Sequence, residues 1–268
     1  MPSKIGLMHS VHHYLNSRVI DSAPLLGLAL KRDHTWLITH NDYILNAQEK
    51  HTLAHLIEQR QKGVPFAYLS GTKGFYHLDF KVTPDTLIPR PETELLIDIA
   101  LDLFKKKPCR LLDLGTGSGI IAITLADKNP HWQVSATDFC DKALAVAKQN
   151  ARQDINFQQG NWFDAVPNQT FDLIISNPPY IEQNDLYLKD LSHEPQSALV
   201  AGKDGLDDIR LIIKNAPKHL NKQGYLLLEH GYNQQQQITQ LLKDNFLNIH
   251  KFNDYNLQNR AILAQLKF

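Results

Sequence analysis

From residue 91 onward, the sequence alternates short apolar stretches with amphipathic ones. The apolar stretches have the length and composition of buried strands and cover residues 109–114, 132–138, 155–160, 171–176 and 224–230. Helical periodicity occupies most of the intervals, over residues 91–104, 120–128, 141–153, 205–220 and 233–245. Because strands joined by helices pair in parallel, this order predicts an open, mostly parallel α/β sheet with helices on both faces.

Two further strand-like stretches follow near the end of the chain, over residues 246–252 and 260–266, with no helical stretch between them. A short connection joins antiparallel strands, whereas parallel strands need a longer crossover. We therefore expect an antiparallel hairpin that completes a sheet of seven strands.

The first third of the chain has a different pattern. Residues 11–61 are helical in pattern, a turn-rich passage follows, and residues 75–82 alternate like a strand. The change of pattern predicts three parts, which are a helical N-terminal domain, a linker and an α/β domain over residues 1–70, 71–89 and 90–268.

Composition narrows the class of protein. The 268 residues are 43% hydrophobic and 21% charged, which is ordinary for a soluble globular protein. Basic and acidic residues both number 28, so the chain lacks the net positive charge usual in nucleic-acid-binding domains. The N-terminal sequence has no apolar signal-peptide core, and no apolar run is long enough to cross a bilayer. We expect a cytoplasmic protein.

No metal site is expected. Cys109 and Cys140 have neither the spacing of a zinc site nor that of a disulfide framework. His51 and His55 lie four residues apart on one predicted helical face, but Thr52 stands where a zinc peptidase motif has glutamate. A solvated helix face is the favoured interpretation of this pair.

Three polar features follow predicted strands, at the edge of the sheet where α/β proteins bind ligands. The loop "DLGTGSG" begins at Asp113 and ends at Gly119; glycines let the backbone approach a ligand, and the helix N-terminus favours an anion. Asp138 ends the next strand, 138 − 119 = 19 residues after Gly119, near the spacing of about 20 at which an acid binds ribose hydroxyls. "NPPY", residues 177–180, follows the fourth strand, which its prolines stop because neither donates a ladder hydrogen bond.

The glycine spacing bears on the choice of nucleotide. Gly115, Gly117 and Gly119 form G-x-G-x-G, whereas the dinucleotide fingerprint would place its third glycine at Ile120. The tighter spacing resembles the nucleoside-binding loop of class I methyltransferases, which use S-adenosylmethionine.

"NPPY" is suited to methylation of a nitrogen conjugated with a carbonyl or an aromatic ring. Such a nitrogen must become pyramidal before it attacks a methyl sulfonium, and acceptors outside its plane favour that change. The Asn177 side-chain oxygen and the Pro178 carbonyl can each accept one N–H, Pro178 and Pro179 stiffen the loop, and the Tyr180 ring can stack on the planar group. Neither a metal nor a strong base is needed, because the methylated nitrogen sheds its proton. Orientation of two reactants is worth up to ~7–11 kcal/mol, against ~1–3 kcal/mol for one buried hydrogen bond, so positioning should dominate.

Other polar and aromatic residues near the strand ends leave alternatives open. Trp162 follows a strand in "QQGNWFD" and is expected to flank an adenine ring, with Asn161 at the edge of the ring; a core-edge aromatic is the alternative. For Asp113, a bond to the loop or to the cofactor's ammonium and a structural role are about equally expected.

Three longer stretches resemble the HemK/PrmC family of release factor glutamine methyltransferases. They are "LIPRPETE" at residues 87–94, "GVPFAYLSGTKGFYHLDFKV" at 63–82 and "EPQSALVAGKDGL" at 194–206. With the helical N-terminal region and "NPPY", the resemblance covers nearly the whole chain. It departs from the family pattern at Gly74, where an acidic residue is common, and this puts in doubt one local contact of the hairpin.

The resemblance implies an activity and a fold. Members transfer a methyl group from S-adenosylmethionine to the side-chain amide nitrogen of the glutamine in the Gly-Gly-Gln loop of bacterial class 1 release factors, leaving S-adenosylhomocysteine. The implied fold is a class I, Rossmann-like methyltransferase with a seven-stranded, mostly parallel sheet, joined by a β-hairpin linker to a small helical N-terminal domain that docks the release factor.

The resemblance also implies site residues, position by position. The cofactor-binding set is Gly115, Thr116, Gly117, Ser118, Gly119, Asp138, Trp162 and Asn177. The substrate-binding set is Asn177, Pro178, Pro179 and Tyr180, of which Asn177, Pro178 and Tyr180 are the expected catalytic residues. Arg90 is open between a structural role, slightly favoured, and a place at the substrate mouth.

Two alternatives remain at this stage. An adenine amino methyltransferase acting on DNA or RNA shares "NPPY" but usually carries a DNA-reading region and a basic surface. A non-catalytic module would bind S-adenosylmethionine or the release factor without turnover. The expected partner is the release factor, with no membrane and no direct nucleic-acid contact, and a monomer is expected.

Overall fold

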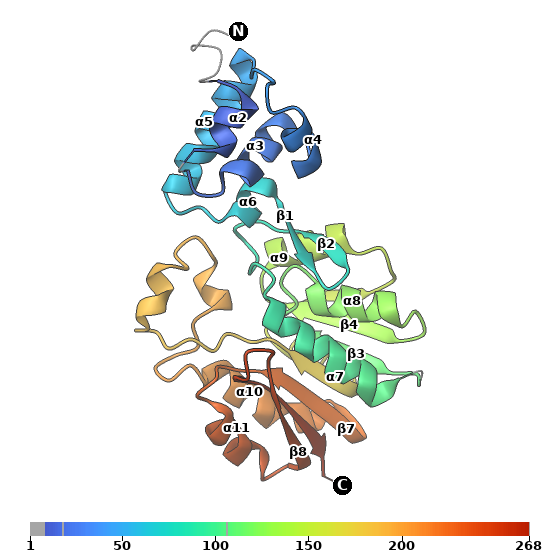
Figure 1. Ribbon diagram of the computed structural model, residues 1–268. Helices are drawn as coiled ribbons and strands as arrows, with labels where there is room; N and C mark the ends of the chain where they lie inside the picture. Colours follow the sequence, from blue (N-terminus) through green and yellow to red (C-terminus); the bar gives the residue numbers. More distant parts are fainter. Residues whose placement is uncertain (1–8, 18, 106, 268) are drawn as a thin grey trace. The chain divides into compact units, whose positions relative to one another are not determined.

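The structure is a computed structural model that describes residues 9–17, 19–105 and 107–267 (Figure 1). Residues 1–8 and 18, which belong to the predicted N-terminal domain, lie outside the described residues, as do residues 106 and 268. The chain divides into two compact units, Met1–Gly71 and Thr72–Phe268.

The first unit is helical in its described part. A buried cluster of aliphatic side chains forms its core, with Leu25, Leu26 and Leu37 almost fully inaccessible to solvent. The longest helix starts with a capping box, because Asn46 accepts from the Glu49 backbone while the Glu49 carboxylate accepts from the Asn46 backbone. The helices are α2 (Val11–Leu15), α3 (Ser22–Leu30), α4 (His34–Thr39), α5 (Ala47–Gln61) and α6 (Phe66–Ser70).

The second unit begins with a β-hairpin of β1 (Thr72–Phe75) and β2 (Leu78–Lys81). The single strand expected from the alternation of residues 75–82 is wrong, because the chain reverses at Tyr76, which takes a positive φ of 56°. The reversal lets Phe75 and Phe80 pack edge to face in the core, with ring centroids 6.1 Å apart. A hairpin is what the family resemblance implies for this stretch.

The seven-stranded sheet has the order β5-β4-β3-β6-β7-β9-β8. The first five strands in this order pair in parallel, and β9 pairs antiparallel with both of its neighbours. The mostly parallel sheet and the terminal antiparallel hairpin are therefore confirmed. The strands are β3 (Arg110–Leu114), β4 (Gln133–Asp138), β5 (Asn156–Gln159), β6 (Phe171–Ser176), β7 (Leu220–Glu229), β8 (Phe246–Asn253) and β9 (Asn259–Leu266).

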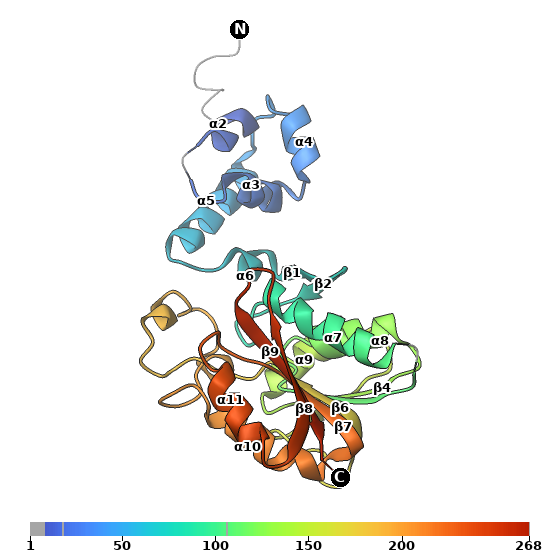
Figure 2. The same ribbon diagram turned by 60° about the horizontal axis from the view of Figure 1, so that its bottom comes forward.

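Helices cover both faces of this sheet (Figure 2). Neighbouring residues of a strand point to opposite faces, and in β3 the side chains of Leu111 and Leu112 enter two different buried clusters. The first cluster includes residues of α7 (Glu94–Phe104) and α8 (Ile120–Lys128), and the second includes residues of α10 (Asp207–Asn215) and α11 (Gln235–Leu242). Such two-sided burial explains why the central strands are mostly apolar.

Several boundaries differ from the sequence expectation. The helix expected over residues 205–220 stops at Asn215, because Pro217 cannot continue an α-helix, and a 3₁₀ turn of Ala216–Lys218 follows. Strand β7 then starts at Leu220, which pairs with Phe171 of β6. A 3₁₀ turn of Pro91–Thr93 likewise precedes α7.

Candidate active site

A cavity of about 350 Å³ lies at the carboxyl ends of β3, β4 and β6. Its volume falls within the range of small-molecule sites. All of its walls come from the second unit, and they bring together the glycine loop, the acid that ends β4 and the start of "NPPY". The lining residues are Asp85, Thr86, Leu87, Gly115, Gly117, Asp138, Phe139, Cys140, Ala143, Asn161, Trp162, Asn177, Pro179, Pro195, Ser197, Ala198, Val200 and Asp208.

The glycine loop between β3 and α8 needs its glycines for two different reasons. Gly119 has a φ of +88°, and a Cβ there would lie 2.6 Å from the Ile123 Cδ1 atom. Gly115 also has a positive φ, and a Cβ there would meet the Trp162 ring at 3.3 Å. A side chain at Gly119 would therefore collide with Ile123 of α8, the helix that Gly119 precedes. At Gly115, the absence of a side chain leaves room for the Trp162 ring at the cavity wall.

Asp138 is held in a fixed orientation at the cavity. One carboxylate oxygen accepts from the Gly117 backbone at 2.9 Å, and the other accepts from the Cys140 backbone at 2.9 Å. Burial raises the pKa of this carboxyl, while these backbone hydrogen bonds act to lower it. Asp138 lines the cavity, where an ionised carboxylate, which only accepts hydrogen bonds, suits hydroxyl donors.

Asp113 fastens the glycine loop from inside the protein. It is fully buried, and one of its oxygens accepts from the Thr116 hydroxyl at 2.6 Å and from the Ala122 backbone at 3.2 Å. Its other oxygen, Oδ1, has no hydrogen-bond partner among the described residues. Among the roles left open by the sequence, the structure shows the contact to the loop.

The buried Asp113 carboxyl should make stability depend on pH. Burial raises its pKa to about 7, so the folded protein holds this proton more tightly than the unfolded chain does. Its contribution to the free energy of unfolding is therefore full below the unfolded pKa of about 3.9 and is lost as pH rises through about 7. Asp113→Asn should remove on the order of 2–4 kcal/mol of this decline between pH ~4 and ~7.

Urea denaturation at a series of pH values measures this effect. The exposed Asp164→Asn provides the matched control, since it makes the same chemical change on the surface. Equal pH slopes for the parent and for Asp113→Asn would contradict the assignment.

Trp162 is fixed on the cavity wall by its backbone and by its ring. Its φ is 50°, and its carbonyl accepts from the Thr137 hydroxyl at 3.2 Å. Burial raises the pKa of Asp208, and a hydrogen bond from Trp162 counteracts this rise. The ring thus lies between Gly115 and Asp208, with one part facing the cavity.

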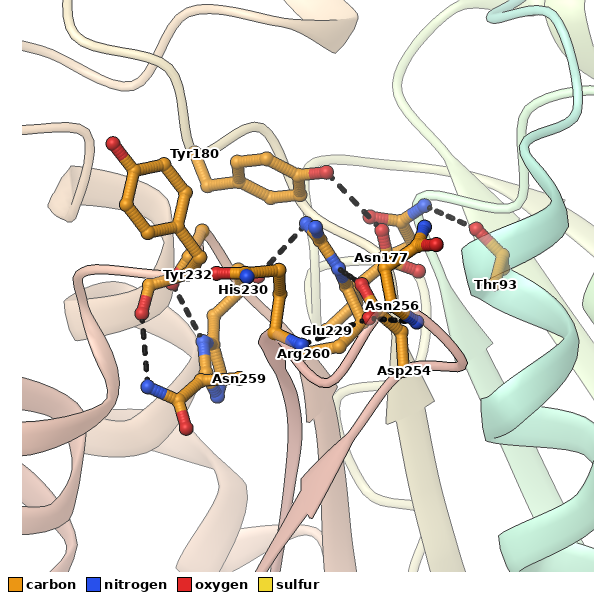
Figure 3. Close-up of polar contacts among 12 residues, drawn as sticks. Thr93, Asn177, Tyr180, Glu229, His230, Tyr232, Asp254, Asn256, Asn259 and Arg260 are labelled. Atoms are coloured by element: carbon orange, nitrogen blue, oxygen red, sulfur yellow. Dashed lines mark hydrogen bonds and ion pairs between the residues drawn. The ribbon is translucent and has the colours of Figure 1, made fainter.

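In "NPPY", which follows β6, the side chains of Asn177 and Tyr180 have different hydrogen-bond partners (Figure 3). Asn177 and Pro179 line the cavity, and the Asn177 amide nitrogen donates to the Thr93 hydroxyl at 3.0 Å. The Tyr180 hydroxyl points instead to the end of β7, where it donates to the Glu229 carboxyl at 3.2 Å. Burial raises the pKa of Tyr180, and the charge of Glu229 adds to the rise.

Some of the expected site residues line the cavity, and others do not. Among the described residues, the cavity lining includes six members of the expected set, which are Gly115, Gly117, Asp138, Trp162, Asn177 and Pro179. Thr116, Ser118, Gly119, Pro178 and Tyr180 are not in this lining. Thr116 and Ser118 are buried within the loop, and Gly119 caps α8.

Several lining residues were not expected from the sequence. Phe139 and Cys140 could have been found, because they directly follow the acid that ends β4. Asp208 and the 3₁₀ turn of Gln196–Ala198 carry no such signal, since only the tertiary fold brings them to the cavity.

Arg90 has a structural partner. Its guanidinium donates to Glu194 at 2.5 Å, and the second oxygen of Glu194 accepts from the Ile88 backbone at 3.0 Å. The Glu194 side chain is 3% exposed and that of Arg90 is 32% exposed. The pair thereby connects the chain before α7 with the segment between β6 and α10.

Arg90→Ala should lower the free energy of unfolding by about 1–3 kcal/mol. This is less than the ~3–5 kcal/mol for breaking a fully buried pair, because Arg90 is partly hydrated. Glu194→Gln should cost less, since it removes the buried charge and keeps an acceptor for Ile88. Urea denaturation would measure both, with the exposed Arg152→Ala as the control. A loss for Arg90→Ala no greater than that of the control would contradict a stabilising pair.

The described residues contain no group of three or more His, Cys, Asp or Glu side chains arranged to hold a metal ion. His51 and His55 both lie exposed on α5. Cys109 and Cys140 are free thiols. Within residues 9–17, 19–105 and 107–267, no helix has both the length and the apolar character to cross a membrane.

Comparison with known proteins covers both units. Residues 12–71 match the PrmC N-terminal domain, and residues 105–263 match a methyltransferase domain. A release factor glutamine methyltransferase of Coxiella burnetii is 44% identical over 229 residues, which are 84% of this chain and 83% of that protein. One of Vibrio cholerae is 43% identical over 260 residues, covering 94% and 91% of the two chains.

Solved structures support the fold. A methyltransferase from Pyrococcus furiosus aligns with a TM-score of 0.55 and 21% identity, over 78% of this chain and 98% of that one. A ribosomal protein L11 methylase from Lactobacillus delbrueckii aligns with a TM-score of 0.52 and 24% identity, over 67% and 81%. The fold is that of class I methyltransferases, and the identity to the curated relatives extends through both units. The chain belongs to the family of release factor glutamine methyltransferases.

Proposed function

We propose that this protein transfers a methyl group from S-adenosylmethionine to the side-chain amide nitrogen of the glutamine in the Gly-Gly-Gln loop of class 1 release factors. The product of the cofactor is S-adenosylhomocysteine. The observation that carries the proposal is the identity of 43–44% to release factor glutamine methyltransferases over 84–94% of the chain. Because release factors act in translation, we place the activity in the cytoplasm. We also expect the enzyme to act as a monomer.

The residues at the cavity fit S-adenosylmethionine. Asp138 lines the cavity, where its carboxylate suits ribose hydroxyls, and the half-buried Trp162 ring suits one face of the adenine. Gly115 and Trp162 both line the cavity, and a side chain at Gly115 would crowd the Trp162 ring that is proposed to contact the adenine. Asn161 lies on the same wall, where its amide suits the edge of the adenine.

When bound, S-adenosylmethionine supplies a methyl group on a positively charged sulfur. The chain's own residues would hold the substrate amide beside it. With its nitrogen directed at Thr93, Asn177 keeps its side-chain oxygen for a substrate N–H, and the Pro178 carbonyl is the proposed second acceptor. Two acceptors outside the amide plane favour a pyramidal nitrogen. As it gains the methyl group, the nitrogen releases one proton to the solvent, so charge balances without a strong base.

The N-terminal unit is proposed to dock the release factor. This role rests on the match of residues 12–71 to the PrmC N-terminal domain. It also rests on the alignment with the Vibrio cholerae relative, which covers most of both chains and so includes that unit. Tyr180 is proposed to stack on the substrate amide through its ring.

Methyl transfer from labelled S-adenosylmethionine tests the proposal. Three substrates would be compared: purified release factor, the same factor with its Gly-Gly-Gln glutamine replaced, and DNA that contains adenine. Label on the intact factor alone is the expected result. Label on the DNA or on the glutamine-replaced factor would overturn the substrate, and absence of label with cofactor shown to bind would favour a non-catalytic module.

A further inference from the structure

Four consecutive glutamines occupy residues 234–237, where α11 begins, and the first of them is the most deeply buried. Gln234 directly precedes the helix and is 4% exposed, whereas Gln236 and Gln237 are exposed to solvent. A glutamine that enters the interior gives up its hydration and its rotamer freedom, so its amide needs partners inside the protein. The contacts of Gln234 supply such partners for both ends of the amide.

The Gln234 amide has one possible orientation. Its oxygen accepts from the Gly231 backbone at 2.9 Å. Its nitrogen donates to the carbonyls of Tyr180 at 3.0 Å, Gly205 at 3.1 Å and Asp204 at 3.3 Å. A backbone N–H only donates and a carbonyl only accepts, so exchange of the two amide ends would lose these hydrogen bonds. The surrounding backbone therefore fixes the direction in which the nitrogen points.

The three carbonyls belong to two segments that are distant in sequence. Tyr180 ends "NPPY", and Asp204 and Gly205 form the turn before α10. The two segments lie very close together, because a Cβ at Gly205 would be 2.2 Å from the Tyr180 carbonyl oxygen. The Asp204 carboxylate accepts from Arg210 of α10 at 2.5 Å, which fastens the turn to that helix. Gln234 thus joins the end of "NPPY" to a turn that is itself held in place.

Tyr180 is held at two points. Its hydroxyl donates to Glu229, the last residue of β7, at 3.2 Å (Figure 3). Its carbonyl accepts from Gln234, which follows β7 by a short segment. One anchor acts on the ring and the other on the backbone, so together they restrict where the ring can lie. This ring is proposed to stack on the substrate amide, and the nearby Pro178 carbonyl is the proposed second acceptor.

We propose that Gln234 is a positioning residue for methyl transfer, which acts by holding the Tyr180 carbonyl and with it the "NPPY" stretch. The inference rests on the proposed function and concerns the same site. Within the described chain, Gln234 is not one of the residues that line the cavity, so it acts through Tyr180. Its hydrogen bonds do not involve Asp138 or Trp162. Its loss should therefore disturb the orientation of the substrate amide more than the binding of S-adenosylmethionine.

Comparison of kcat with cofactor affinity tests this role. Gln234→Met roughly keeps the length of the side chain and removes its hydrogen bonds. Its kcat with release factor should fall by about 10- to 100-fold, because a misplacement of about 1 Å can cost 10²-fold in rate. Its Kd for S-adenosylmethionine, measured by calorimetric titration, should stay within about threefold of the parent. The exposed Gln236→Met makes the same change on α11 and should keep the parental kcat and Kd.

Gln234→Glu separates the donated hydrogen bonds from the packing of the side chain. A protonated glutamic acid can donate to one of the carbonyls, whereas an ionised carboxylate only accepts and would face three carbonyl oxygens. Burial and these oxygens favour the protonated form. The kcat of Gln234→Glu relative to the parent should therefore be at least about fivefold higher at pH 6 than at pH 8. The same ratio for Gln234→Met should not change with pH.

Three results would overturn the inference. The first is a parental kcat for Gln234→Met, and the second is a pH-independent ratio for Gln234→Glu. The third is a loss of cofactor affinity as large as the loss of kcat, since Gln234 would then support the fold of the whole site. Failure of the parent to methylate release factor would instead overturn the proposed function.

Discussion

Asn177→Ala is expected to lower kcat for release factor methylation by at least about 100-fold while S-adenosylmethionine still binds. The variant loses the side-chain oxygen that is proposed to accept a substrate N–H, and removal of one pre-organised group of this kind costs ~10²–10³ in rate. Asn177 also lines the cavity at the end of a rigid strand, so loss of its side chain removes part of the wall that orients the substrate. Single-turnover kinetics and calorimetric titration of the cofactor measure the two effects separately.

The control for this variant is Asn168→Ala, which makes the same change at an exposed position. Its kcat and cofactor affinity should match the parent. A melting transition at the parental temperature would show that Asn177→Ala keeps the fold. Normal turnover by Asn177→Ala would mean that the substrate pocket has been placed wrongly.

Asp138→Ala is expected to weaken S-adenosylmethionine binding by about 100-fold or more. Two hydrogen bonds from ribose hydroxyls to a charged acceptor are each worth ~1.5–3 kcal/mol, and every 1.4 kcal/mol is a factor of ten in affinity. The change also releases the backbone N–H of Gly117, which joins the glycine loop to β4, and that of Cys140 just after β4. Isothermal titration calorimetry provides the measurement.

Asp138→Asn refines the same test. Asparagine keeps one oxygen as an acceptor but places an N–H₂ group beside a backbone donor, so an affinity between those of the parent and Asp138→Ala is expected. An unchanged Kd in both variants would show that the ribose lies elsewhere. The exposed Asp164→Asn serves as the control for loss of a carboxylate.

Most of the sheet could be predicted from the sequence, because the central strands are buried on both faces and stand out as short apolar runs. Residues 171–176 were predicted as a strand and form β6 over that same range. The hairpin of residues 72–81 could not be found from periodicity, since its reversal depends on a positive φ at Tyr76 rather than on glycine or asparagine. The start of β7 was missed because pairing of Leu220 with Phe171 outweighs a local helical pattern.

The same distinction between local and tertiary information applies to the residues of the candidate site. Gly115, Asp138 and Asn177 could be placed together in advance, because each ends or directly follows one of three parallel strands and the ends of such strands meet. Thr93 and Glu229 could not, because their partners are 84 and 49 residues away in sequence and only the folded chain brings them into contact. "LIPRPETE" marked the region of Thr93 through a family resemblance, without a physical reason for the threonine.

Fragmentation mass spectrometry of release factor after incubation with this protein and S-adenosylmethionine tests the central claim most directly. The account predicts one added methyl group on the side-chain amide of the Gly-Gly-Gln glutamine with the parent protein, and almost none with Asn177→Ala at the same protein concentration and time. A methyl group on any other residue of the factor, or equal methylation by the parent and Asn177→Ala, would contradict the account.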